Sequence, residues 1–123
     1  MTLVAGSYER FLFGYHLSNA SLEGSPPKNF LTYPAHQGPV RSMACCGALV
    51  VSGGSDDTFH TFDLSQSRDL GSQANPAQGA VTAVALFAPP GRVSPQHLLT
   101  GAAGGEIAVW ARSGRRASQP WTL

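Results

Sequence analysis

The side chains of this chain that could do chemistry gather in one short stretch. Ser52 precedes the adjacent acids Asp56 and Asp57, and the histidines His36 and His60 lie on either side of this group. Carboxylates and imidazoles at such spacing could form an acid–base pair or hold a metal ion. A serine near a histidine could also serve as a nucleophile.

None of these chemistries has the pattern that it needs. Adjacent aspartates on a tight Gly-Gly-Ser turn point apart, and no His-x-x-x-His or paired-cysteine spacing adds metal ligands. Ser52 lacks the nucleophile elbow of hydrolases. The glycine-rich stretches at 53–55 and 101–105 are not followed by the lysine of a phosphate loop. We therefore predict that the chain is not an enzyme and has no metal or cofactor site.

The composition predicts an all-β protein with many short strands. The 123 residues include 14 glycines and 9 prolines, which interrupt the chain too often for long helices, and 42% of residues are hydrophobic. The net charge of +1 gives no reason to expect direct nucleic-acid binding. No run approaches the roughly 18 apolar residues of a membrane span. The two cysteines are neighbours, Cys45 and Cys46, which suggests a reducing compartment.

The chain repeats itself. Two copies each contain an aliphatic strand, a turn of small residues and a second strand, and their equivalent positions lie 48 residues apart: Gly53 and Gly101, Phe59 and Ile107, Phe62 and Trp110. Val40 and Val81 match at 41 residues, and an insertion at 89–95 accounts for the difference. A partial copy opens the chain with Gly6 and Leu12. Units of about 40 to 48 residues with up to four strands are typical of propeller blades.

A blade cannot cover its own apolar faces, so it must bury them against its neighbours. The candidates for these faces are Val40, Leu49, Val51, Phe59, Val81, Val84, Leu98, Ile107 and Val109. If the segments are successive blades, Gly6, Gly53 and Gly101 should have equivalent surroundings.

Between these strands the residues resemble WD repeats. In that family a hydrogen-bonded brace joins a histidine before the first strand, a hydroxyl on the second, an aspartate in the next turn and a tryptophan. The first full copy has His36, Ser52 and Asp56 at these places. Phe62 stands where tryptophan is usual. Its ring has no N–H to donate, so the brace should end at Ser52.

The second copy departs further from the family pattern. It keeps Thr100 and Trp110 but has Ala77 in place of the histidine and Gly104 in place of the turn aspartate. The resemblance therefore implies no polar brace here, with Trp110 held by packing alone.

A closer similarity covers residues 1–111. The matching stretches are LVAGSYE at 3–9, LFGY at 12–15, VVSG at 50–53, DDTFH at 56–60, LLTGA at 98–102 and GEIAVW at 105–110. They are similar to the opening of the p21-activated protein kinase-interacting protein family of WD-repeat proteins. The resemblance implies the N-terminal portion of a seven-bladed propeller.

About two and a half of the expected seven blades would then be present, an incomplete WD-repeat β-propeller. The divisions are 1–33 as part of the closing blade, 34–73 as the first full repeat, 74–111 as the second repeat with its insertion at 89–95, and 112–123 as a basic, disordered tail. Unpaired edges and an open blade face should leave the isolated chain marginally folded at best.

The resemblance implies a non-catalytic scaffold for protein–protein interactions in the nucleus and nucleolus, with the cytoplasm as a further location. Its first implied role is biogenesis of the large ribosomal subunit, with pre-ribosomal assembly factors as partners. The second is negative regulation of a p21-activated kinase. A third, substrate adaptor of a ubiquitin ligase, stays open because fold does not fix function. No binding residues can be named from the sequence, and the loop at 89–95 is the first place to test.

Overall fold

The computed structural model describes residues 2–17, 24, 26–76, 79–92, 94–112 and 120–123. Their regular structure consists of strands: β1 Thr2–Gly6, β2 Phe11–His16, β3 Lys28–Pro34, β4 Val40–Cys46, β5 Leu49–Gly54, β6 Thr58–Asp63, β7 Arg68–Ala74, β8 Val81–Phe87, β9 His97–Ala102, β10 Ile107–Arg112 and β11 Trp121–Thr122. Across these ranges no helix is long and apolar enough to span a membrane.

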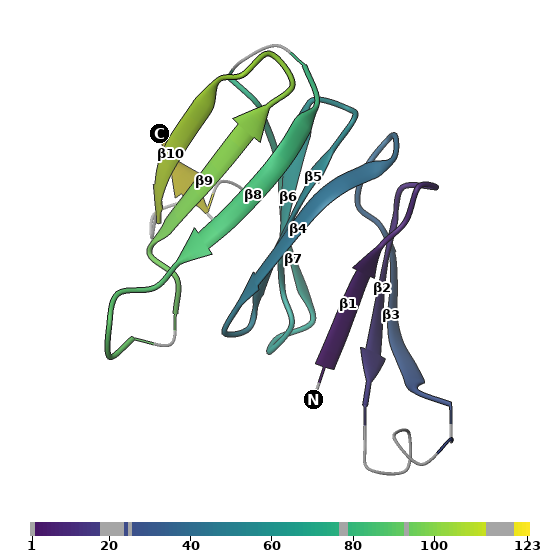
Figure 1. Cartoon of the computed structure of the whole chain (residues 1–123). Coiled ribbons are helices and arrows are strands. Elements are labelled where there is room, and N and C mark those ends of the chain that lie inside the picture. The colour runs from purple at the N-terminus through teal and green to yellow at the C-terminus, as the bar shows by residue number, and fades with distance from the viewer. Residues whose placement is uncertain (1, 18–23, 25, 77–78, 93, 113–119) are drawn as a thin grey trace.

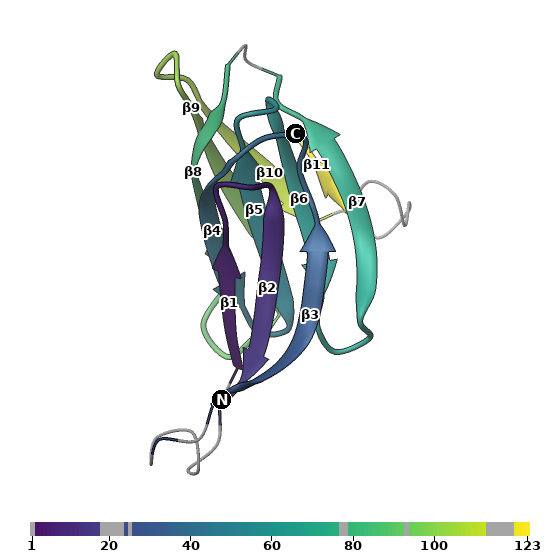
Figure 2. The same ribbon diagram turned by 90° about the vertical axis from the view of Figure 1, so that its right-hand side faces the viewer.

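The strands form three antiparallel sheets that stand side by side (Figure 1). The first contains β1, β2 and β3, the second β4 to β7, and the third β8 to β11, each in sequential order. The second sheet lies between the other two (Figure 1), and Figure 2 looks along the row with the first sheet facing the viewer. The all-β prediction is confirmed, and this open row of sheets is the arrangement expected of part of a propeller.

Irregularities of the strands recur from sheet to sheet. The register of β4 against β5 shifts between Val40 and Ser42, and that of β8 against β9 shifts between Val81 and Ala83, 41 residues later. A second irregularity, between β2 and β3, recurs 47 residues later between β6 and β7. Bulges bend strands at defined places, so the sequence repeat corresponds to a repeat of backbone geometry.

Gly6 and Gly53 lie at equivalent contacts between neighbouring sheets. A Cβ on Gly6 would lie 2.6 Å from Cγ1 of Val40, and one on Gly53 would lie 2.5 Å from Cγ1 of Val81. These approaches leave room only for glycine. The expectation of equivalent surroundings holds for this pair, whereas Gly101 faces no following sheet among the described residues.

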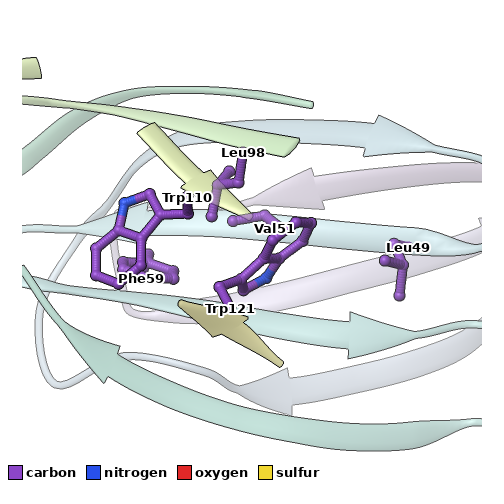
Figure 3. Close-up of a cluster of buried hydrophobic side chains, with 6 residues drawn as sticks. All are labelled: Leu49, Val51, Phe59, Leu98, Trp110 and Trp121. Carbon is purple, nitrogen blue, oxygen red and sulfur yellow. The ribbon is translucent and has the colours of Figure 1, made fainter. Parts of the chain in front are cut away.

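A cluster of buried side chains fills the space between the second and third sheets (Figure 3): Leu49, Val51, Phe59, Leu98, Trp110 and Trp121. The rings of Phe59 and Trp110 meet edge to face with their centroids 4.8 Å apart. Burying a large apolar side chain contributes about 1.5–3 kcal/mol, so this cluster is a main source of cohesion between the two sheets.

Two candidates for the blade faces are not buried. Ile107 is 74% exposed and Val109 is 56% exposed. Successive side chains of a strand point to opposite faces, and Trp110 of the same strand packs towards the second sheet. Ile107 and Val109 therefore lie on the outer face of the third sheet, which no described residue covers.

The prediction of a disordered tail over 112–123 is wrong at both ends of that range. Arg112 is the last residue of β10, and Trp121–Thr122 form β11, which pairs with β10 and completes a four-stranded sheet. Trp121 is 1% exposed, and burial of so large a ring stabilises its place on the sheet. Residues 113–119 lie outside the described ranges.

The predicted insertion falls between β8 and β9. Within it the N–H of Arg92 donates to the carbonyl of Pro89 at 3.0 Å. The N–H of Gln96 donates to the carbonyl of Phe87 at 2.9 Å and closes the base of the loop. Val93 lies outside the described residues. The loop is thus held at its base while most of it faces solvent.

Candidate functional site

His36 is the centre of a buried polar network. It lies between β3 and β4 and is 3% exposed. Its Nδ1 is 3.0 Å from Oδ1 of Asp56, in the turn between β5 and β6, and its Nε2 is 2.8 Å from Oγ of Ser52 on β5. Gly54 lies against the ring, where a Cβ would have no room. The structure thus brings together the three residues that the sequence predicted for the brace.

The Asp56 carboxylate is the acceptor of this network. The N–H of Gln37 donates to Oδ2 at 2.8 Å, and the hydroxyl of Thr58 donates to Oδ1 at 2.8 Å. Burial of the carboxyl raises its pKa, but the hydrogen bonds from Gln37, Thr58 and His36 outweigh this effect, and the pKa of Asp56 is lowered. The network therefore stabilises the ionised form.

Ser52, His36 and Asp56 follow the order of a Ser-His-Asp nucleophile. Ser52, however, is completely buried on β5, a strand that is buried along its whole length. A substrate has no path to this hydroxyl in the folded chain. What the arrangement can do is join the segment before β4 to a strand and a turn of the second sheet.

A second buried histidine belongs to a network that connects the first sheet to the second through Tyr33. His60 on β6 is 5% exposed, with Nδ1 2.8 Å from Oγ of Ser72 and Nε2 2.7 Å from Oδ1 of Asp69, both on β7. The hydroxyl of Tyr33 on β3 donates to Oδ2 of the same aspartate. The sequence suggests no partner for His60, because this network has no counterpart in the other copies.

These groups shift each other's pKa values. Burial lowers the pKa of His60, and the nearby charge of Asp69 opposes this only in part. Burial together with the bond to Asp69 raises the pKa of Tyr33 to about 12. Burial raises the pKa of Asp69, but the Tyr33 hydroxyl, the Gly71 N–H and His60 lower it by more. At neutral pH the network thus contains one negative charge.

The remaining residues predicted for the brace are Phe62 on β6, Thr100 on β9 and Trp110 on β10. Phe62 is buried, and its ring packs against Tyr33 with centroids 5.6 Å apart. Trp110 donates from Nε1 to Oγ1 of Thr100 at 3.1 Å, so the expectation that packing alone holds this ring is wrong. Thr100 lies diagonally across the β9–β10 pair on the same face, within reach of the indole. Ala77, expected at the histidine position, lies outside the described residues.

Trp121 makes a similar bond between sheets. Its Nε1 donates to Oγ1 of Thr61 on β6 at 3.0 Å. The Gln73 side chain on β7 donates to the carbonyl of Trp121 at 3.0 Å and accepts its N–H at 3.3 Å. The sequence does not predict this contact, because residues 112–123 are basic and follow the last repeat. The available signal was a tryptophan, a residue seldom left in solvent, at the end of a polar stretch.

A cavity of about 450 Å³ borders this contact. It is lined by Ser72, Gln73 and Ala74 of β7, by Trp110, and by the C-terminal residues 121–123. In the portion of the chain that the structure describes, no group of three or more His, Cys, Asp or Glu side chains is placed to hold a metal ion.

The amino-acid sequence has relatives among curated proteins, although no family model matches the chain. It is 27% identical over 109 residues to a zebrafish protein, Danio rerio p21-activated protein kinase-interacting protein 1-like, covering 89% of this chain and 27% of that one. The chicken (Gallus gallus) protein of the same name is 30% identical, with the same two coverages. Mouse (Mus musculus) p21-activated protein kinase-interacting protein 1 is 33% identical over 67% of this chain and 22% of its own length.

Among solved structures, the computationally designed Ika8 protein matches with a TM-score of 0.69 and 20% identity, over 89% of this chain and 30% of that chain. This likeness concerns the fold alone. The sequence relatives carry the family assignment, and the chain spans about a quarter of their length. By its sequence relatives, the chain belongs to the p21-activated protein kinase-interacting protein family.

Proposed function

We propose that this chain is part of a non-catalytic WD-repeat scaffold whose protein partner is a p21-activated kinase. The observation that carries the proposal is the name shared by relatives that are 27–33% identical to it. The buried networks support the non-catalytic part, because Ser52 and His36 hold strands together and offer no accessible reactive atom.

Two other roles stay open, the first implied by the sequence resemblance and the second because fold does not fix function. Biogenesis of the large ribosomal subunit in the nucleus and nucleolus would make pre-ribosomal assembly factors the partners. A ubiquitin-ligase adaptor would instead contact ligase subunits. Both stay predictions, and affinity purification separates them from the kinase proposal.

The test is a binding measurement with purified proteins. The 123-residue chain, checked for folding by near-UV circular dichroism, is titrated against the regulatory segment and, separately, the kinase domain of a p21-activated kinase. We expect saturable binding of the chain to the regulatory segment. We also expect the chain to reduce the activity of the kinase. Replacement of 89–95 by a glycine-serine linker of equal length probes the first candidate loop, with Thr32→Ala, at an exposed position of β3 in the first sheet, as a control.

Affinity purification from nuclear extract with the same folded chain gives the second readout. A p21-activated kinase among the captured proteins supports the proposal. If the folded chain binds no kinase segment and captures pre-ribosomal proteins or ligase subunits instead, the kinase proposal is wrong and the corresponding alternative replaces it.

A further inference from the structure

A cavity of about 230 Å³ lies between the second and third sheets, at the end of β5 away from the His36 brace. Leu49 begins β5 and borders the cavity, whereas Gly54 at the other end of β5 lies against His36. The β4–β5 turn, the β6–β7 turn, the end of the β8–β9 loop and the end of β10 meet here. The polar side chains of the lining are Asp63, Ser65, Ser94 and Arg112.

Arg112 is held in place by the ring of Trp121. The two residues are directly opposite each other in the β10–β11 pair, and Cζ of Arg112 lies over the Trp121 ring, 5.7 Å from its centroid. A guanidinium group is attracted to the face of an indole ring. Trp121 is itself fixed, because it belongs to the buried cluster of Figure 3 and donates to Thr61 of the second sheet. The guanidinium therefore has a firm support at the cavity wall.

The guanidinium has a buried donor without a partner. Nη1 of Arg112 is buried, and no group of the described residues accepts a hydrogen bond from it. Within the same residues no carboxylate forms an ion pair with Arg112. Buried polar groups are almost always hydrogen-bonded, and a guanidinium group can only donate. The acceptor for Nη1 must therefore come from outside the described part of the chain.

The surroundings of Arg112 favour a carboxylate as this acceptor. The two oxygens of a carboxylate match the forked N–H groups of a guanidinium. Asp63 borders the same cavity, and its Oδ1 accepts the N–H and the hydroxyl of Ser65 at 2.9 and 2.6 Å. Repulsion from Asp63 grows with the charge of the ligand, so a carboxylate with one charge fits better than a phosphate with two.

We propose that this cavity binds the side-chain carboxylate of a glutamate or aspartate of a protein partner, with Arg112 as its donor. The partner would approach beside the β8–β9 loop, where Ser94 is exposed. This inference goes beyond the kinase proposal, because it names the chemical group that is recognised and holds for any protein that presents such a group.

NMR titration of the ¹⁵N-labelled 123-residue chain tests the site without a partner protein. The probe is glutamate with an acetylated amino group and an amidated α-carboxyl group, so that only its side chain is charged. Glutamine blocked in the same way is the uncharged control. We expect saturable shifts of the Arg112 side-chain N–H and the Ser65 and Ser94 amides with blocked glutamate, and binding of blocked glutamine that is weaker by roughly tenfold or more.

Three variants show whether Arg112 and this cavity cause the binding. Arg112→Gln should abolish binding of blocked glutamate, whereas Arg41→Gln, at an exposed position of β4, should leave it unchanged. Arg112→Gln also removes the contact with Trp121 and could disturb folding. Ser94→Trp avoids this difficulty, because it places a large ring at an exposed position of the cavity lining and should block binding in a folded chain. Near-UV circular dichroism checks the folding of each variant.

Each outcome supports or overturns the proposal. Binding that requires the charge of the probe, is lost in Ser94→Trp and is kept in Arg41→Gln supports it. The proposal is wrong if blocked glutamate causes no shifts up to its solubility limit, if blocked glutamine binds equally well, or if inorganic phosphate binds more tightly. It is also wrong if a folded Arg112→Gln chain binds blocked glutamate as before. Failure of the kinase binding measurement would leave these results unaffected, so the two proposals are tested separately.

Discussion

Asp56 accepts hydrogen bonds from Gln37, Thr58 and His36, so one carboxylate holds a turn, a strand and the segment before β4. Asp56→Asn keeps the size of the side chain but removes its charge and replaces one acceptor by a donor. Hydrogen bonds to charged groups contribute about 1.5–3 kcal/mol. We expect Asp56→Asn to lower the free energy of unfolding by about that amount in urea titrations.

The neighbouring aspartate provides the control for that substitution. Asp57 is exposed and has a φ of 62°, a conformation that asparagine tolerates well. Asp57→Asn should therefore change the free energy of unfolding by less than about 0.5 kcal/mol. Equal effects of the two substitutions would show that the Asp56 network adds no stability.

The buried His60 predicts a dependence of stability on pH. Its folded-state pKa lies below the ordinary value of 6.5. Between these two values the unfolded chain binds a proton that the folded chain does not, so stability falls as the pH drops below about 6.5. The lowered pKa values of Asp56 and Asp69 extend this loss at more acidic pH, below the ordinary value of 3.8.

Urea midpoints measured from pH 8 to pH 5 check this prediction. We expect a decline below about pH 6.5 that is shallower in His60→Gln, whose side chain does not titrate. His97→Gln, at an exposed position outside the network, should keep the slope of the original protein. An unchanged slope in His60→Gln would contradict the assignment.

At the scale of elements, β11 has two residues but connects two sheets. Trp121 is fully buried, donates to Thr61 and is held on its backbone by Gln73. Replacing a buried tryptophan by alanine costs about 3–5 kcal/mol. We expect Trp121→Ala to destabilise the protein by that amount in thermal or urea unfolding, whereas Thr122→Ala, at an exposed position of the same strand, should have little effect. Similar losses in the two variants would make β11 dispensable.

The elements that could be predicted from the sequence are those that repeat. Glycine spacing located the turns between paired strands, and the WD-repeat resemblance placed His36 beside Asp56 and Ser52. The brace depends on residues within one copy, so a single-copy pattern suffices to find it.

Contacts between sheets could not be found in the same way. The bond from Trp121 to Thr61 spans 60 residues, and that from Tyr33 to Asp69 spans 36. Neither pair repeats in another copy, and in each case tertiary packing, not local spacing, brings the residues together. For Thr100 and Trp110 the spacing was visible, but the missing histidine and aspartate led to the wrong conclusion that the tryptophan lacked a partner.

For the molecule as a whole, the row of sheets has a middle member that is covered on both faces and outer members that are not. Val51, Ser52 and Phe59 of the second sheet are fully buried, while the third sheet exposes apolar side chains on one face. Exposed apolar faces and sheet edges favour self-association of isolated chains. We therefore expect the uncovered outer faces of the row, more than weak packing between its sheets, to make the isolated protein self-associate.

A charge on the open face tests this view. Ile107→Lys places an ammonium group at a position that is 74% exposed, so it should change the unfolding midpoint little while it reduces concentration-dependent light scattering. The equivalent substitution in the covered sheet, Phe59→Lys, buries the charge and should prevent folding. If Ile107→Lys instead unfolds the chain as Phe59→Lys does, residue 107 is covered in solution, and the third sheet is not the open end of the row.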